Sequence, residues 1–344
     1  MGTHVIEAGF PVNSDAEFEA VRDIAESTRV TTCGLARVVE KDIEAALDSG
    51  VDMVHTFVST SDVQLQDSMH ATRQEALDTA VDCVEMIKDA GVECMFSPMD
   101  ATRTDEDFLV EVIEATSAAG ADWINIPDTC GVATPRRFYD LIEIVDDCTD
   151  AYIDVHTHDD FGLASANAIS GFEAGASQAQ VSVNGIGERA GNAAYEEVVM
   201  ALESLYDVDT GIDTTRITEL SRIVEEKSDI GVPANKPVVG RNAFSHESGI
   251  HAAGVIENSD TFEPGVMTPE MVGATRELVL GKHTGAHSVR ERLVDAGYDP
   301  TEAEVREVTR RVKEYGAEEQ VTMSVLERFA EEIGVTEESE EVRA

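Results

Sequence analysis

The sequence predicts an α/β fold, a TIM (β/α)8 barrel, followed by a mainly helical C-terminal region. Up to about residue 205, short β-rich segments alternate with amphipathic helical segments, the order that parallel strands with helical crossovers require. Polar residues follow nearly every β-rich segment, and a barrel gathers the carboxyl ends of its strands at one mouth. A doubly wound sheet would concentrate such residues at a single switch point. The barrel is therefore favoured.

Seven strands and six intervening helices account for this part of the chain. The predicted strands are His4–Ala8, Val30–Gly34, Met53–Phe57, Glu93–Ser97, Trp123–Pro127, Tyr152–His156 and Gln180–Asn184. The predicted helices are Asp15–Ser27, Glu40–Ser49, Thr72–Ala90, Asp105–Ala119, Pro135–Asp147 and Gly162–Ala174. Several of these helices are followed by a glycine, which is a common signal for the end of a helix. Because the first strand begins almost at residue 1, we expect the first βα unit of the barrel to be missing.

After residue 205 the sequence changes in character, and four parts are expected. They are a barrel domain that is incomplete at its N-terminus (1–205), a linker with a helix (206–240), a C-terminal subdomain (241–335) and an acidic tail (336–344). Within the linker the helix is predicted at Thr215–Ser228, and two more helices are predicted within residues 301–334. The tail carries mostly charged residues and is expected to fray.

The charge balance excludes several classes of function. The chain has 69 acidic and 25 basic residues, a formal net charge of −44, which repels nucleic acids and anionic membranes. Acidic residues are spread over helical segments together with apolar ones, so the composition indicates a folded protein adapted to high salt, typical of a halophile. Five cysteines without a C-x-x-C pair indicate a reducing compartment. No signal peptide or membrane span is recognised, and a cytoplasmic location is expected.

Two neighbouring segments carry the strongest chemical signal. His156 and His158 lie two residues apart at the end of a predicted strand, so both imidazoles point the same way and can reach one cation. Two buried structural histidines would give the same pattern. The next strand leads into a loop with three glycines at 185, 187 and 191, around Glu188, Arg189 and Asn192. The glycine spacing and its late position differ from a dinucleotide-binding fingerprint.

These segments resemble the 2-isopropylmalate, homocitrate and citramalate synthase family. The resemblance is carried, in order along the chain, by Ile6–Pro11, Pro127–Pro135, His156–Leu163, Gly185–Ala194 and His246–His251, and it extends from residue 3 to about residue 330. It implies a TIM barrel and a divalent metal. It also implies a homodimer in which the swapped C-terminal region completes the neighbouring active site. The substrates implied are acetyl-CoA and a 2-oxo acid, joined by a Claisen condensation and released by thioester hydrolysis.

The resemblance also assigns roles to individual residues. The metal ligands are His156, His158 and Asn192, a mixed set of donors that suits Mg²⁺, Mn²⁺ or Zn²⁺, and K⁺ is implied as an activator. Catalytic roles fall to His251, Glu188 and Arg189, with His251 suited by its ordinary pKa to proton transfer. Contacts with the substrates are expected from His55, Thr129, Thr134, Asp100 and Arg103. Many relatives have Glu where this chain has Met99 and Tyr where it has Phe262, so the general base is left open.

Several functions remain after these assignments. The first is 2-isopropylmalate synthase, in leucine biosynthesis, with 2-oxoisovalerate as the 2-oxo acid. Citramalate synthase (with pyruvate) and homocitrate synthase (with 2-oxoglutarate) use the same chemistry. A basic residue placed for a second substrate carboxylate would favour homocitrate synthase. A lyase on the same barrel is a further alternative, although it would not need the segment His246–His251. The last alternative is a truncated, non-catalytic partner subunit.

The family's first strand ends in Arg-Asp, which supplies a further metal ligand and stabilises oxyanions, and this sequence begins after that point. A barrel without its first strand has open sheet edges. We therefore expect the chain as written to fold poorly or to be nearly inactive, and activity to appear when the chain is extended upstream. Full activity without the extension, measured as thiol release from acetyl-CoA, would contradict this expectation.

Overall fold

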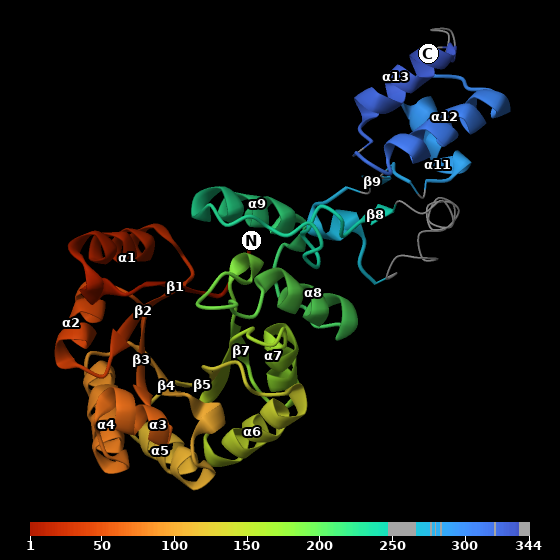
Figure 1. The fold of residues 1–344 in the computed structure, drawn as a ribbon. Coiled ribbons are helices and arrows are strands. Elements are labelled where there is room, and N and C mark those ends of the chain that lie inside the picture. The colour runs from red at the N-terminus through yellow and green to blue at the C-terminus, as the bar shows by residue number, and fades with distance from the viewer. Residues whose placement is uncertain (247–265, 276, 279, 283, 320, 337–344) are drawn as a thin grey trace. The chain divides into compact units, whose positions relative to one another are not determined.

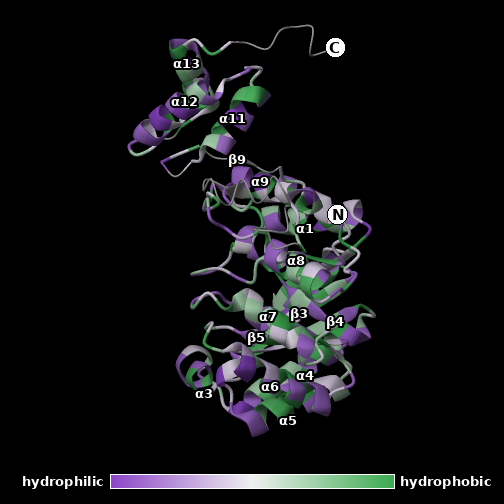
Figure 2. Cartoon of the chain, turned by 90° about the vertical axis from the view of Figure 1, so that its right-hand side faces the viewer, coloured by the Kyte–Doolittle hydropathy of each residue, from purple (hydrophilic) through white to green (hydrophobic). Residues whose placement is uncertain are grey.

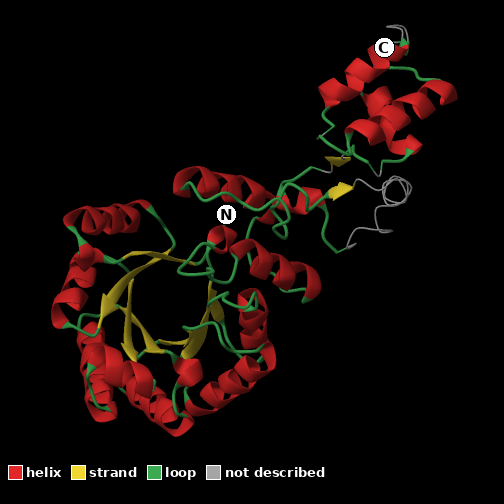
Figure 3. Ribbon diagram, viewed as in Figure 1, coloured by secondary structure: helices red, strands yellow, loops and turns green. Residues whose placement is uncertain are grey.

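The computed structural model describes residues 1–246, 266–275, 277–278, 280–282, 284–319 and 321–336, and the chain divides into two compact units, Met1–Asp213 and Thr214–Ala344. The first unit contains a curled sheet of seven parallel strands in the order β1 to β7, each paired with the next along the chain. Helices follow the strands and cover the outer face of the sheet (Figures 1 and 3). This is the predicted TIM-barrel fold.

The seven strands of the first unit are β1 (Val5–Gly9), β2 (Thr31–Arg37), β3 (Met53–Ser59), β4 (Glu93–Met99), β5 (Trp123–Asp128), β6 (Tyr152–Thr157) and β7 (Gln178–Gln180). Its helices are α1 (Asp15–Ser27), α2 (Glu40–Asp48), α3 (Asp62–Gln64), α4 (Arg73–Asp89), α5 (Glu106–Ala118), α6 (Pro135–Cys148), α7 (Ala164–Glu173) and α8 (Tyr195–Leu205). The predicted strands from β1 to β6 are confirmed with ends that differ by a few residues.

The last strand of the sheet differs from its prediction. We expected Gln180–Asn184, but β7 ends at Gln180, and Val183–Gly185 forms a 3-10 turn. Asn184 has a φ of 63°, a left-handed conformation that a strand cannot contain. The turn reverses the chain so that Ser182 forms a bridge with Ala194, which leads directly into α8. The strand therefore ends, and the loop begins, four residues earlier than the pattern indicated.

The two faces of each strand have different environments. Residues such as Val54, Phe96, Ile124 and Val155 face the helices and belong to one large apolar core, all fully buried. The alternate residues point into the barrel, where Cys33, Met53 and Met95 pack with Val5 and Trp123 near the amino ends of the strands. Nearer the carboxyl ends, the inward residues are polar. The interior is therefore layered, with an apolar floor below a polar layer.

All five cysteines of the chain are free. Cys33 is 1% exposed and Cys94 is 0% exposed, and both belong to strands of the barrel. Burial raises the pKa of the Cys94 thiol to about 12, and the carboxylate of Asp122 adds to the shift. Burial also raises the pKa of Cys33. These two thiols are consequently protonated at neutral pH and act as small apolar side chains.

The second unit contains α9 (Ile217–Ser228), β8 (Ser245–His246), β9 (Glu277–Leu278), α11 (Ala286–Asp295), α12 (Glu302–Tyr315) and α13 (Met323–Ile333). The two helices predicted within residues 301–334 are confirmed as α12 and α13, whereas α11 was not predicted. The last three helices share a core of their own, which includes Leu293, Val308, Leu326 and Phe329. Figure 2 shows hydrophilic and hydrophobic residues along the same helices, for example α13, as expected for helices that bury one face.

Acidic side chains occupy the exposed face of α1, where Asp15, Glu19, Asp23 and Glu26 are all exposed and only Val21 is fully buried. Few basic side chains are available to offset the repulsion between these carboxylates, because the whole chain has 25 lysine and arginine residues for 69 acidic ones. In the part of the chain that the structure describes, no helix has the length and apolar character needed to cross a bilayer.

We expect the fold to be stabilised by salt, because mobile cations screen repulsion between surface carboxylates. Raising KCl from about 0.1 M to about 2 M, where the screening length falls to a few ångströms, should raise the Tm by several degrees in a calorimetric scan. Sucrose, which strengthens burial without screening charge, serves as the control and should raise the Tm less. A Tm that is insensitive to KCl would contradict this interpretation of the net charge.

Candidate active site

A chain of hydrogen bonds crosses the interior of the barrel from β1 to β6. His55 Nδ1 lies 2.7 Å from Glu7 Oε2, and His55 Nε2 lies 2.6 Å from Ser97 Oγ. The Ser97 hydroxyl is 2.8 Å from Asn125 Oδ1, and Asn125 Nδ2 donates to Asp154 Oδ2 at 2.6 Å. The Asn125 oxygen can only accept, so Ser97 donates to it and must accept from His55 Nε2–H. The direction of each bond from His55 to Asp154 is thereby fixed.

The two ends of this hydrogen-bonded chain have opposite electrostatic character. The Glu7 side chain is 41% exposed, and the hydrogen bond and charge of His55 lower its pKa below that of an ordinary glutamic acid. Asp154 is fully buried, and burial raises its pKa to about 7 despite the hydrogen bond from Asn125. Asp154 is therefore partly protonated near neutral pH.

The two predicted metal-binding histidines lie together at the end of β6. Their Nε2 atoms are 3.1 Å apart, and their rings meet nearly edge to face with an interplanar angle of 84°. Burial lowers the pKa of His156 to about 4, and the neighbouring His158 lowers it further. Burial also lowers the pKa of His158. Both rings are neutral at pH 7, which leaves nitrogen lone pairs for a cation.

The third predicted ligand lies beside this pair. Asn192 forms an antiparallel bridge with His158, and its buried Oδ1 has no hydrogen-bond partner among the described residues. A Cβ atom at Gly187 would lie 2.6 Å from that Oδ1, so only glycine leaves room for the amide. The loop that contains three glycines in the sequence thus allows Asn192 to approach His158 closely.

The donor set fits a divalent cation. Two nitrogen ligands about 2.1 Å from one ion and at right angles to each other lie about 3 Å apart, close to the separation of the two Nε2 atoms. An orphaned amide oxygen adds a hard donor. His, Cys, Asp and Glu side chains alone form no metal-binding group of three in the described ranges, so the site depends on Asn192. The Nδ1 atoms of both histidines are buried without a partner there.

The loops that follow β5, β6 and the short β7 are tied together at the mouth. Arg189 donates to both carboxylate oxygens of Asp160, at 2.9 and 2.8 Å, and to the carbonyl oxygen of Thr129 at 2.8 Å. A Cβ atom at Gly131 would lie 2.7 Å from Asp160 Oδ2 and 2.9 Å from the His158 carbonyl oxygen. The loop of Thr129 therefore packs against the backbone of His158, and the guanidinium of Arg189 holds this loop to Asp160.

The contacts of Asp100 connect the loops after β3, β4 and β5, and they include an ion pair with Arg103. The Asp100 carboxylate accepts hydrogen bonds from Arg103 Nε at 2.8 Å and from Arg103 Nη2 at 2.7 Å. Ser61 donates to the same carboxylate at 2.5 Å. The backbone N–H of Asp100 donates to Thr129 Oγ1 at 2.9 Å. Asp100 is fully buried, and its carboxylate is surrounded by protein groups.

The remaining predicted site residues are placed as follows. Thr134 is exposed and caps α6, because its hydroxyl accepts a hydrogen bond from the Arg137 N–H. Glu188 is exposed in the glycine-rich loop. His251 and Phe262 lie outside the described residues. Met99 is half-buried at the end of β4, and its carbonyl oxygen accepts a hydrogen bond from the Thr60 N–H.

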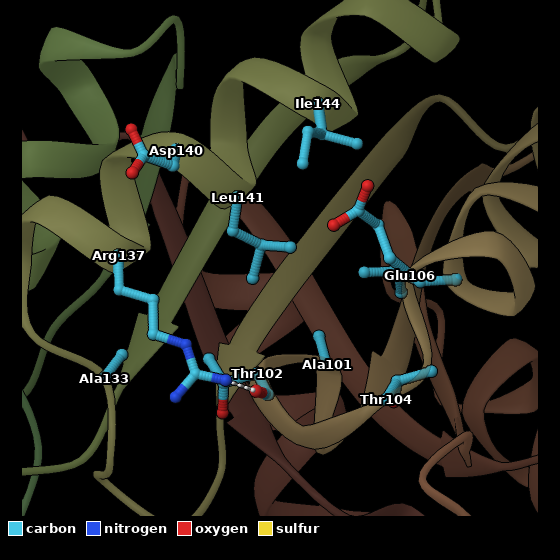
Figure 4. Close-up of a pocket in the computed structure, with 10 residues that line it drawn as sticks. Ala101, Thr102, Thr104, Glu106, Ala133, Arg137, Asp140, Leu141 and Ile144 are labelled. Carbon is cyan, nitrogen blue, oxygen red and sulfur yellow. Dashed lines mark hydrogen bonds between the residues drawn. The ribbon is translucent and has the colours of Figure 1, made fainter.

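A separate pocket lies behind the loop of Thr129. It has a volume of about 170 Å³ and lies between α5 and α6. In Figure 4, Leu141 and Ile144 line one side, and Arg137 reaches toward the carbonyl oxygen of Thr102. The Thr102 hydroxyl donates to Asp128 Oδ1 at 2.8 Å, so this wall also supports the end of β5. The pocket is distinct from the histidine pair.

Two sets of residues were not predicted as site residues from the sequence. One is the polar side chains inside the barrel, and the other is Asp160, which pairs with Arg189 at the mouth. These residues are Ser97, Asn125, Asp154, Gln180 and Asp160. The first three lie on the same inward-facing alternation of their strands as His55 and His156. That alternation, followed strand by strand, could have identified the inward-facing polar layer. Asp160 gave no comparable signal, because its partner Arg189 is distant in sequence.

The buried carboxyl of Asp154 should make stability depend on pH. Its pKa of about 7 in the folded protein exceeds the value of about 4 for an unfolded chain. Its stabilising contribution is thus present below about pH 4 and is lost as the pH rises through 7. Between pH 5 and 8, the free energy of unfolding measured by urea titration should fall by about 2 to 3 kcal/mol more in the wild-type protein than in Asp154→Asn.

Asp62→Asn is the matched control for this measurement. The hydrogen bond from Arg73 lowers the pKa of the exposed Asp62 carboxyl. The Asp62→Asn substitution should therefore change the pH dependence of the unfolding free energy only below the pH at which an ordinary carboxyl titrates. Parallel pH profiles for the wild-type protein and Asp154→Asn between pH 5 and 8 would show that Asp154 does not titrate there.

Comparisons with known proteins agree on the family. The HMGL-like family model matches residues 1–224, and the homocitrate synthase post-HMGL domain-like model matches residues 238–320. A 2-isopropylmalate synthase of Sulfolobus acidocaldarius is 48% identical over 316 residues, 91% of this chain and 81% of the relative. One from Sulfurisphaera tokodaii is 46% identical over 334 residues, 96% of this chain and 86% of the relative.

Other relatives are longer than this chain. A 2-isopropylmalate synthase of Methanocaldococcus jannaschii is 45% identical over 339 residues, which is 97% of this chain and 65% of the relative. A relative from Methanosarcina acetivorans is 52% identical over 315 residues, 91% of this chain and 61% of its own length. The chain therefore spans less than two thirds of the length of these two relatives.

Solved structures support the fold. The hydroxymethylglutaryl-CoA lyase of Pseudomonas aeruginosa is similar with a TM-score of 0.59 and 25% identity, over 67% of this chain and 83% of the lyase. The HMG-CoA lyase of Brucella melitensis is similar with a TM-score of 0.56 and 21% identity, over 66% of this chain and 87% of the lyase. The two family models, with identities of 48% and 46% to relatives of which the chain covers 81% and 86%, show that the chain belongs to the 2-isopropylmalate synthase family, with an HMGL-like barrel.

Proposed function

We propose that this protein is an acyltransferase that condenses acetyl-CoA with 2-oxoisovalerate and hydrolyses the thioester, giving 2-isopropylmalate and free coenzyme A. The observation that carries the proposal is the pair of neutral histidines with Asn192 beside the loop of Thr129, at the carboxyl ends of parallel strands. The names of the relatives support the acyl transfer, since the three named above are 2-isopropylmalate synthases.

In this proposal the side chains of His156, His158 and Asn192 hold a divalent metal, Mg²⁺ or Mn²⁺ with Zn²⁺ as an alternative. When bound, the metal supplies Lewis acidity toward the keto oxygen of the 2-oxo acid and toward the alkoxide that forms there. The pKa of His156 near 4 keeps that ring unprotonated at neutral pH, so it can serve as a ligand without losing a proton.

The substrate carboxylate is assigned to the Thr129 hydroxyl, which lies on the loop that packs against the backbone of His158. Since Thr129 Oγ1 accepts from the Asp100 N–H, its own proton remains for the substrate. His251 is proposed to move the proton of the acetyl methyl group or of the new alcohol. The carboxylates of the mouth loops are paired with arginines, so neither Asp100 nor Asp160 is proposed as the base.

Two observations favour 2-oxoisovalerate over 2-oxoglutarate and a synthase over a lyase. The arginines at the mouth are engaged by carboxylates, Arg103 by Asp100 and Arg189 by Asp160, so neither is free to bind a second substrate carboxylate. Residues 238–320 follow the barrel and match the post-HMGL domain model, and the two lyase structures cover 67% and 66% of this chain. Pyruvate, a smaller monocarboxylate, remains the closest competitor.

We propose that the active form is a homodimer in which the C-terminal region of one subunit completes the site of the other. The assignment of His251 to that region motivates this proposal. Sedimentation at micromolar concentration should give a dimer, and mixing His251→Ala with His156→Ala protein should recover part of the activity. A monomer that is fully active would contradict the exchange.

The activity is tested by thiol release from acetyl-CoA in concentrated KCl, with Mg²⁺ or Mn²⁺, offering 2-oxoisovalerate, pyruvate and 2-oxoglutarate in turn. We expect turnover with 2-oxoisovalerate, and a loss of at least about a hundredfold in His156→Ala, since the ligands of a catalytic metal matter more than their supporting residues. His287→Ala, which removes an exposed histidine on α11, is the control and should retain activity.

Titration with Mn²⁺ followed by electron paramagnetic resonance separates metal binding from catalysis. The wild-type protein and His287→Ala should bind the ion, and His156→Ala should bind it far more weakly. If His156→Ala turns over substrate at the wild-type rate, the proposed site is wrong. Cleavage of a hydroxyacyl-CoA without condensation would identify a lyase.

A further inference from the structure

Asp100 has an unusual backbone conformation that its surroundings maintain. Its φ and ψ angles are 68° and 34°, in the left-handed region, which among residues with a Cβ atom only Asn and Asp visit readily. It is fully buried, and its carboxylate, carbonyl oxygen and N–H are all hydrogen-bonded. The partners come from three successive loops, with Ser61 after β3, Arg103 and Thr104 after β4, and Thr129 after β5. A strained conformation of this kind persists only where the surroundings hold it in place.

The direction of the Asp100 N–H determines what the Thr129 hydroxyl can do. The N–H donates to Thr129 Oγ1 at 2.9 Å, and this bond occupies the hydroxyl as an acceptor. A hydroxyl has a single proton, and here that proton is left to donate to another group. Thr129 is half-buried at the mouth, on the loop that contacts the His158 carbonyl oxygen through Gly131. The hydroxyl is therefore set as a donor, as an anionic ligand requires.

We propose that Asp100 is a positioning residue for the 2-oxo acid, which it affects through Thr129 rather than by contact. Its carboxylate, held by Arg103 and Ser61, maintains the left-handed backbone that aims the N–H at Thr129. Because the N–H is held in this direction, the Thr129 hydroxyl keeps its own proton for a hydrogen bond to the substrate carboxylate. The inference rests on the proposed function, because it takes Thr129 as the contact of the 2-oxo acid. It differs from the role expected from the sequence, in which Asp100 itself contacts substrate.

The test compares two substitutions at this position, with binding of 2-oxoisovalerate in the presence of Mg²⁺ measured by calorimetry. Asp100→Ala removes the hydrogen bonds that maintain the left-handed backbone and should weaken binding about tenfold or more, as expected for a lost hydrogen bond to a charged group. Asp100→Asn accepts left-handed angles and keeps one carbonyl oxygen for Ser61 or Arg103, so it should recover most of the affinity. In steady-state assays the KM for the 2-oxo acid should rise, with the KM for acetyl-CoA unchanged.

A double-mutant cycle with Thr129→Val separates positioning from a general structural role. If Asp100 acts through the Thr129 hydroxyl, Asp100→Ala should weaken binding in the wild-type background but change it less than about twofold in the Thr129→Val background. Asp62→Asn is the control, since it also removes a doubly hydrogen-bonded arginine–carboxylate pair but on the exposed α3, and it should leave affinity unchanged. Far-UV circular dichroism and Tm show whether each variant is folded.

The outcomes distinguish the two proposals. Unchanged affinity in folded Asp100→Ala, or equal losses in both backgrounds of the cycle, would overturn the positioning role alone. Binding of 2-oxoisovalerate by the wild-type protein without any thiol release would overturn the proposed function, while the cycle still decides the role of Asp100. Failure of the wild-type protein to bind any 2-oxo acid would overturn both. If Asp100→Ala does not fold, Asp100→Asn decides the question. A folded Asp100→Asn protein that has lost its affinity for 2-oxoisovalerate would count against the proposal.

Discussion

Consecutive residues of a parallel strand point to opposite faces, and in this sheet both faces are buried against different surroundings. Val54 and Phe96 face the helices, while their neighbours Met53 and Met95 face the interior floor. A shift of pairing by one residue would move the polar residues His55 and Asp154 into the helix-facing core and apolar residues into the polar layer. The ladder pairs His55 with Met95, and Asn125 with Asp154, and this register brings the interior side chains into one hydrogen-bonded chain. The position of the histidine pair at the mouth follows from the same register.

The mouth above this interior is shaped by two arginine–carboxylate clamps. Arg189 binds Asp160 from a distant loop, whereas Arg103 binds Asp100 within one loop, and Asp100 reaches the neighbouring loops through Ser61 and Thr129. In a protein with so few cations, two of them are used to fix loops beside the candidate site. Bidentate pairs impose direction as well as distance, so they orient the loops more closely than apolar packing would. The protein side of the site is thus organised by contacts among its own residues.

The barrel could be predicted from the sequence because its signals are local and repeated. Each strand from β1 to β6 was located within a few residues, and the pair His156 and His158 was recognised from its spacing together with the glycine-rich segment after the next strand. The end of β7 was misplaced because Asn184 was assigned to the strand although the Asn184-Gly185 pair is a turn signal. The engagement of Asp100 and Arg189 was also hidden, because a charged residue near a strand end looks the same whether it is paired or free. Pairings between loops depend on three-dimensional proximity, which composition and periodicity do not encode.

The buried thiols offer a view of the barrel's dynamics. Cys33 and Cys94 lie on β2 and β4, one in the floor of the interior and one in the helix-facing core. A disulfide reagent reacts with the thiolate, and these groups are protonated and shielded from solvent in the native state. Their modification therefore requires the strands to separate, so the slow phase of labelling reports the opening of the sheet itself. The protein carries two intrinsic reporters of local unfolding, one on each face of the same sheet.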